Sequence, residues 1–155
     1  MSRYLPLFMS PGSAAYFPLT LMRVAIGLFF FASGFNKVFV PASQAMMLET
    51  ITEAGIPFPA IAAVFVASCE MLCGLLLAGG ILSRLNAAVL TLISVVALFT
   101  VGIHHIPGGI SLLTWYSWLL YLPETLYMLI LVMVIVQGSG PWSVDRLIAK
   151  GIARR

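Results

Sequence analysis

Charged residues are scarce in this sequence. Its 155 residues include only eight Lys or Arg and five Asp or Glu, which together make 8% of the chain. Soluble domains carry about 25% charged residues. Intrinsically disordered chains and nucleic-acid-binding domains both depend on abundant charge, so the composition excludes both classes and a nucleic-acid partner.

Cysteine is almost as rare, because Cys69 and Cys73 are the only two. Two cysteines cannot build a disulfide framework. Their spacing of four residues places them on one helical face, where side chains run nearly parallel and a disulfide has poor geometry. We expect small packing residues here, and the alternative is a soft-metal site that includes them.

Hydrophobic residues, in contrast, make up 61% of the chain, and the mean hydropathy is +1.08. A domain of this size leaves much of its chain surface exposed after folding. Water would therefore meet a large apolar surface, whereas a lipid bilayer accommodates it. The composition predicts an integral membrane protein.

Turn residues divide the chain into four apolar segments, at residues 17–38, 60–80, 85–103 and 117–137. Each is close to the about 20 residues that a membrane-spanning helix needs. We therefore predict an all-α fold: one domain over residues 1–155, arranged as an antiparallel four-helix bundle with short loops. Pro123 lies near the start of the fourth segment and should kink it. The alternative interpretation of the first segment is a signal peptide.

Basic residues are unevenly distributed across this topology. With four spans, one side of the membrane holds Arg3, Arg84, Arg146, Lys150, Arg154 and Arg155, and the other side holds only Lys37. Cytoplasmic loops carry the excess of Lys and Arg, so both termini should be cytoplasmic. Residues 44–54 in the first outer loop form either a short amphipathic helix on the membrane surface or an ordinary polar linker.

The first span carries ionisable residues in a regular pattern. Arg23, Gly27, Phe30, Gly34 and Lys37 are spaced by 4, 3, 4 and 3 residues, which places all five on one helical face. The glycines allow a second helix to approach closely. Ionisable side chains inside a membrane mark a functional site by default, so this face should look into the bundle.

Two carboxylates lie in other spans. Glu70 is near the middle of the second span, and Arg23 is its expected partner because a guanidinium can bind a carboxylate through two bonds. This pair is either functional or a structural ion pair that sets helix register. Glu124, nearer the outer face, would form a proton relay with His104 or His105. The histidines are equally compatible with an interfacial position in contact with water.

Several short pieces of the chain, in this order, resemble the DoxX family of small four-span membrane proteins. They are Leu21-Met22-Arg23 leading to Gly27, Gly34-Phe35-Asn36-Lys37, Ala54-Gly55-Ile56-Pro57, the run from Cys69-Glu70 to Leu77, Gly79-Gly80-Ile81-Leu82-Ser83-Arg84-Leu85, the histidine after the third span, and Gly140-Pro141-Trp142-Ser143-Val144-Asp145. The name-giving relatives form part of a thiosulfate:quinone oxidoreductase, and other members accompany thiol-redox or metal-related proteins. The resemblance implies a bacterial cytoplasmic (inner) membrane location. It points to Arg23, Lys37, Glu70, His105 and Glu124 as site positions.

Three functional hypotheses follow. The first is a quinone-linked oxidoreductase subunit, with acid–base residues Glu124, His105 and Glu70 and substrate-binding residues Arg23, Lys37, Phe30, Trp118 and Tyr121. Quinone is then the expected cofactor, and a protein partner or a second copy of the chain is expected beside the bilayer. The second is copper handling or small-molecule transport through His104, His105, Cys69, Cys73, Met46 and Met47. The third is a structural or assembly subunit of a membrane complex.

Overall fold

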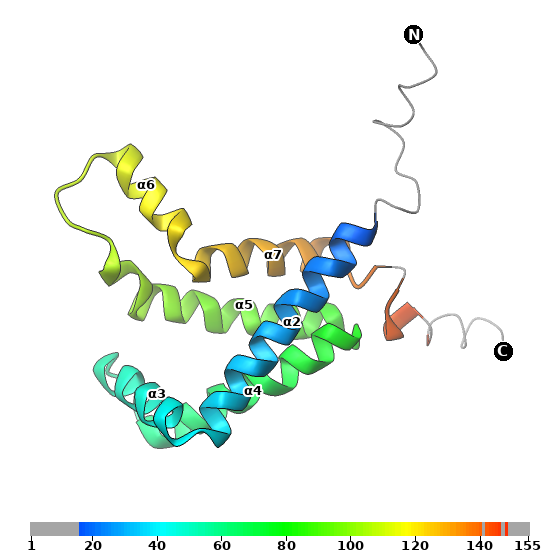
Figure 1. The fold of residues 1–155 in the computed structure, drawn as a ribbon, viewed down its shortest axis with the longest axis horizontal. Helices are drawn as coiled ribbons and strands as arrows, with labels where there is room; N and C mark the ends of the chain where they lie inside the picture. The colour runs from blue at the N-terminus through cyan, green and yellow to red at the C-terminus, as the bar shows by residue number, and fades with distance from the viewer. Residues whose placement is uncertain (1–15, 141, 147, 149–155) are drawn as a thin grey trace, which may run out of the picture.

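The computed structural model describes residues 16–140, 142–146 and 148, and within them every regular element is a helix (Figure 1). The all-α prediction is therefore confirmed for this part of the chain. The elements are α2 (Tyr16–Phe39), α3 (Pro41–Glu53), α4 (Pro59–Gly79), α5 (Ser83–Thr100), the 3₁₀ helix η2 (Gly102–His105), α6 (Leu112–Tyr121) and α7 (Pro123–Gln137).

Glycines let α2 and α4 pack backbone against backbone, as the sequence predicts. A Cβ atom added at Gly27 would lie 2.6 Å from the backbone nitrogen of Ala78, and one at Gly34 would lie 2.7 Å from the carbonyl oxygen of Ala67. Real side chains do not tolerate such distances, so both positions require glycine. The pairing also shows that the two helices run antiparallel, with the start of α2 beside the end of α4.

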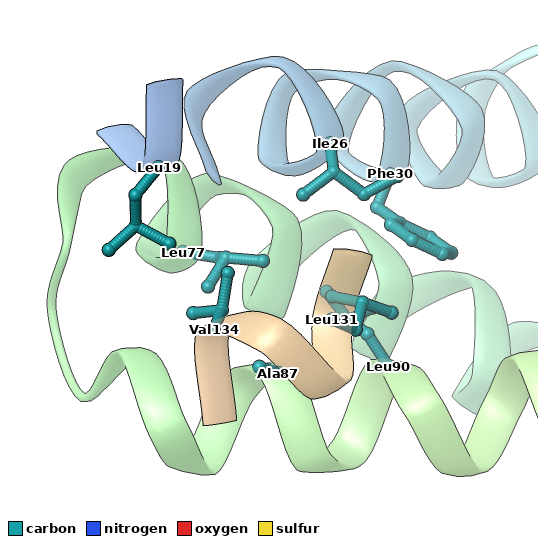
Figure 2. Packing of buried hydrophobic residues seen from close by; sticks show 8 residues of the cluster. All are labelled: Leu19, Ile26, Phe30, Leu77, Ala87, Leu90, Leu131 and Val134. Atoms are coloured by element: carbon teal, nitrogen blue, oxygen red, sulfur yellow. The ribbon is translucent and has the colours of Figure 1, made fainter. Parts of the chain in front are cut away.

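The apolar core lies between the long helices (Figure 2). Its fully or nearly buried members come from α2, α4, α5 and α7: Leu19, Ile26, Phe30, Leu77, Ala87, Leu90, Leu131 and Val134. α2 packs on α4 and α7, and α5 packs on α4 and α7. The core therefore ties all four helices together.

The fourth apolar segment is broken into two helices at Pro123. Proline lacks the N–H that a helix interior needs, and it drives the preceding residue into extended backbone. Leu122 accordingly has φ −71° and ψ 127°, and α6 and α7 meet at an angle of 71°. The expected kink is present, but residues 117–121 belong to α6, which stands away from the other helices (Figure 1).

Three described helices, α2, α4 and α5, are long and apolar enough to cross a membrane. The number rises to four if the bent pair α6 and α7 counts as one span. α7 alone has 15 residues, which at about 1.5 Å per residue is shorter than the hydrocarbon core of a bilayer. The third predicted span ends early, because α5 stops at Thr100 and η2 begins at Gly102. The chain is a multi-pass membrane-type protein.

The two ends of the helical body differ in their elements. α3 is a helix from Pro41 to Glu53 and lies at the end where α2 finishes and α4 begins (Figure 1). At the other end, the start of α2, the α4–α5 turn and the end of α7 meet around a hollow of about 640 Å³ that Tyr16, Leu82 and Gln137 help to line. Arg84 and Arg146 also line this hollow, whereas Arg3, Lys150, Arg154 and Arg155 lie outside the described residues.

Candidate functional site: a cleft with three ionisable groups

A cleft of about 610 Å³ lies between α2, α3, α4 and α5 at the α3 end of the molecule. Sites for small molecules in proteins occupy about 300–1,000 Å³. Most of its wall is apolar. The polar side chains that line it are Ser33, Asn36, Lys37, Ser43, Thr50, Glu70, Thr100 and Glu124.

An ion pair between α2 and α4 forms one wall of this cleft. The Lys37 ammonium lies 2.6 Å from Glu70 Oε2, and the Ser33 hydroxyl donates to the same oxygen at 3.4 Å. The Glu70 side chain is only 6% exposed, whereas that of Lys37 is 28% exposed. A buried carboxylate needs a cation or a hydrogen-bond donor, and Glu70 has both. The lysine remains open to the cleft, so a ligand can reach it.

Arg23 is not the partner of Glu70, so that prediction is wrong. Arg23 is 1% exposed, and its guanidinium donates to the carbonyl oxygens of Leu77 at 2.9 Å, Ala78 at 3.3 Å and Trp142 at 2.9 Å. The antiparallel register brings Arg23 to the end of α4, where unpaired carbonyls attract a cation. Arg23 therefore caps a helix at the far end from the cleft.

Glu124 supplies a second carboxylate to the cleft, from the first turn of α7. Its Oε2 atom is buried and has no hydrogen-bond partner among the described residues. A negative charge in the first turn of a helix is favoured by the helix dipole. A buried oxygen without a partner is rare in proteins and marks a place where a ligand group or water can bind. Gly102 leaves room beside it, since a Cβ there would lie 3.5 Å from Oε2.

No hydrogen bond joins this carboxylate to either histidine in the described part of the chain. His104 and His105 are both exposed and belong to η2. The ring nitrogen Nδ1 of His105 bonds to the carbonyl oxygen of Val101, one turn back, at 3.1 Å. Neither histidine lines the cleft. The relay between Glu124 and a histidine therefore stays a prediction.

The three aromatic residues expected to line a quinone slot are also elsewhere. Phe30 is buried in the core, edge-on to the ring of Tyr127. Trp118 and Tyr121 are exposed on α6, which has no buried residue. None of the three lines the cleft, whose aromatic lining residue is Phe65 of α4.

The soft-metal alternative finds no ligand cluster. Cys69 and Cys73 are free and half-buried, and Cys73 packs against the core. Met46 and Met47 do line the cleft, but the cysteines and histidines do not. Among the described residues, no three His, Cys, Asp or Glu side chains are grouped so that they could hold a metal ion.

Some residues that build the cleft and the opposite end of the helical body were not predicted from the sequence. Ser33 and Asn36 form a polar stripe with Lys37 at i, i+3 and i+4, a spacing that could have revealed them as lining residues. Asp145 caps α5, accepting from the backbone nitrogens of Leu82 at 2.8 Å and Ser83 at 3.1 Å. No sequence pattern signals this cap, because it spans more than sixty residues of chain.

The helices and the cleft together define a class, a multi-pass membrane-type protein with a cleft of about 610 Å³ between its helices. A family model described as DoxX matches residues 18–103, more than half of the 155 residues, and the chain belongs to the DoxX family. The matched region contains Arg23, Lys37 and Glu70, whereas Glu124 lies beyond it. A search of the curated proteins and a search of the solved structures find no match.

Proposed function

We propose that this DoxX-family protein is a redox-associated membrane subunit that binds a quinone in the cleft between α2, α3, α4 and α5. The observation that carries the proposal is the union of an apolar wall with three ionisable groups, one of them the unpartnered Glu124 carboxylate. Quinone binding requires an apolar slot, hydrogen-bond donors to two carbonyl oxygens and groups that transfer protons.

The residues present fit a quinone ring. Lys37 and Asn36 carry N–H donors and Ser33 an O–H donor, and all three line the cleft. Glu70 and Glu124 are acceptors when ionised and donors when protonated. Reduction of a quinone to a quinol consumes two electrons and two protons. In our proposal the two carboxyl groups carry the protons, and a partner subunit that oxidises a sulfur compound delivers the electrons.

The proposal is tested with the purified chain in lipid nanodiscs, by equilibrium titration with a ubiquinone analogue. Glu70→Gln and Glu124→Gln should each weaken binding by about tenfold, equivalent to ~1.4 kcal/mol. Glu70→Gln removes the charged partner that positions the Lys37 ammonium, and Glu124→Gln removes a carboxyl group that donates to a quinone oxygen when it is protonated. Glu49→Gln is the matched control, since Glu49 is exposed on α3 and does not line the cleft. Its affinity should stay within about twofold of the wild type.

Two results would reject the quinone proposal. The first is a wild-type protein that neither binds the analogue nor reduces or oxidises it, with or without thiosulfate. The second is wild-type affinity in both cleft variants. If the latter variants also fold and support the activity of their complex, the ionisable groups serve assembly, which was the third hypothesis from the sequence.

We further propose that the protein resides in the bacterial cytoplasmic membrane as an antiparallel bundle with both termini in the cytoplasm. Supporting this orientation, Arg84 and Arg146 lie at one end and Lys37 at the other. Cysteine variants of an otherwise cysteine-free chain test it with a membrane-impermeant maleimide. A cysteine at Glu53 should react in intact cells, and one at Arg84 only after the cells are opened.

A further inference from the structure

The rim of the cleft combines exposure with an apolar surface. Phe65 of α4 is 68% exposed, and Leu92 and Val96 of α5 are 66% and 43% exposed. All three also line the cleft. A residue that lines a cleft and is exposed stands at its opening, and Met46 of α3 and Asn36 of α2 also meet this condition. The opening therefore extends to the face between α4 and α5, where its rim is apolar.

This opening lies at membrane depth. α4 and α5 are both long and apolar enough to span a bilayer. Counted from Ser83 at about 1.5 Å per residue, Leu92 is about 14 Å and Val96 about 20 Å along α5. Both positions fall within a hydrocarbon core of about 30 Å. The rim therefore faces acyl chains, and the charged groups lie behind it.

The three ionisable groups of the cleft are less exposed than this rim. Glu70 is buried on α4, Lys37 comes from α2, and Glu124 from the start of α7. A ligand that contacts both the ionisable groups and the apolar rim thus carries a polar head and an apolar tail. The volume of about 610 Å³ holds a ring and the beginning of a tail, so the rest of a polyprenyl chain must lie outside.

We propose that the cleft receives its substrate sideways from the bilayer, with the polar head beside Lys37, Glu70 and Glu124 and the tail leaving between Phe65, Leu92 and Val96. This deepens the quinone proposal and rests on it for the identity of the head group. It assigns the substrate to lipid-soluble molecules with a long tail and makes α4–α5 the entrance.

The entrance is tested by introducing a large side chain at its rim. Val96→Trp narrows the opening, and Val132→Trp on α7 is the matched control, because Val132 is 46% exposed and does not line the cleft. The probes are ubiquinone with a full polyprenyl tail and the same ring without a tail, titrated in phosphatidylglycerol–phosphatidylcholine nanodiscs. Val96→Trp should weaken binding of the tailed quinone by about tenfold, and binding of the tail-less ring by less than about twofold.

A second readout uses the same variants without any quinone. Brominated lipids quench tryptophan that contacts acyl chains, so Val96→Trp should add a quenched component to the wild-type fluorescence, as Val132→Trp should. Absence of that component at position 96 would overturn the lateral entrance. So would an equal loss of both probes in Val96→Trp, or no loss of either. If the wild type binds neither probe, quinone is rejected as the substrate, and the quenching alone decides whether the cleft opens to lipid.

Discussion

Helix α2 carries one basic side chain near each end of its packing face, and the two have different environments. Arg23 is fully buried and bonded to backbone carbonyl oxygens of Leu77, Ala78 and Trp142. Lys37 is partly exposed and paired with Glu70 on the wall of the cleft. The difference comes from α4, which presents its carbonyl-rich C-terminus to Arg23 and a side chain to Lys37.

The chemistry of each basic group matches the partners that it binds. A guanidinium has five N–H donors in a fixed plane and can hold several carbonyl oxygens at once, which favours a permanent closure. An ammonium is compact, sits on a flexible chain and can exchange one partner for another. The Arg23 side chain is therefore held by the fold, whereas the Lys37 side chain remains available to a ligand.

The largest loss of stability is expected when the Arg23 hydrogen bonds are removed. Arg23→Met should lower the free energy of unfolding by about 3 kcal/mol, because it removes charged hydrogen bonds to three carbonyl oxygens, of which those of Ala78 and Trp142 are part-buried. Thermal unfolding in detergent measures the loss. Arg23→Lys, which keeps the charge but has fewer donors, should be intermediate. A Met variant as stable as the wild type would remove the distinction between the two ends.

Glycine substitutions in α2 should produce the next largest loss of stability. They should also show that quinone binding depends on one end of the α2–α4 contact. Gly27→Ala and Gly34→Ala each force α2 and α4 apart, and overpacking of this kind costs about 1–3 kcal/mol. Gly34 lies one turn before Lys37 and meets Ala67 and Met71, on either side of Glu70, so Gly34→Ala should also weaken quinone binding. Gly27 meets Gly74 and Ala78 farther along α4, so Gly27→Ala should not. Gly108→Ala is the control, because a Cβ there meets nothing within 4 Å. Equal binding in all three variants would contradict this prediction.

Removal of the cap on α5 should have a smaller effect. Asp145→Ala deprives the backbone nitrogens of Leu82 and Ser83 of their acceptor, which should cost about 1 kcal/mol. Asp145→Asn keeps a carbonyl acceptor and should lose less. Unfolding curves of the two variants supply the comparison, and binding in the distant cleft should remain as in the wild type. A loss of binding with little loss of stability would show that the two ends are coupled.

The smallest effect is expected at His105. It is exposed, and within the described residues its ring bonds to Val101, one turn back, so His105→Gln should change stability by less than about 0.5 kcal/mol. Quinone affinity should stay near the wild-type value, in contrast to Glu124→Gln. Should His105→Gln abolish binding or turnover while the protein stays folded, the cleft as described would be an incomplete site.

Much of the fold was accessible from the sequence because it depends on local chemistry. Apolar runs of about twenty residues predict helices that suit a bilayer. The ends of α4 follow from Pro59 and from Gly79-Gly80, and Gly80 has a φ of +74° that favours glycine. The break before α7 follows from Pro123. Each of these helix boundaries depends on a few neighbouring residues, so each could be predicted from the sequence alone.

The candidate site was only partly accessible. Lys37, Glu70 and Glu124 were identified as site residues, and all three line the cleft. Glu70 was assigned the wrong partner, since periodicity shows which residues share a face but not how two helices slide along each other. The aromatic residues on α6 were placed in the slot because the bend at Pro123 was expected to be a kink within one span and not a change of direction of 71°.

The sequence by itself determined that this chain is helical, that it belongs in lipid, and that α2 presents glycine and basic residues on one face. These properties follow from composition and from the 3.6-residue period of a helix. Only the tertiary structure decided that Arg23 binds backbone carbonyl oxygens at one end of α4 and that Lys37 binds Glu70 farther along it. The reason is the seating of Gly27 and Gly34 against the backbone of α4, because close contact permits few registers and the side chains must accept the partners that this register supplies.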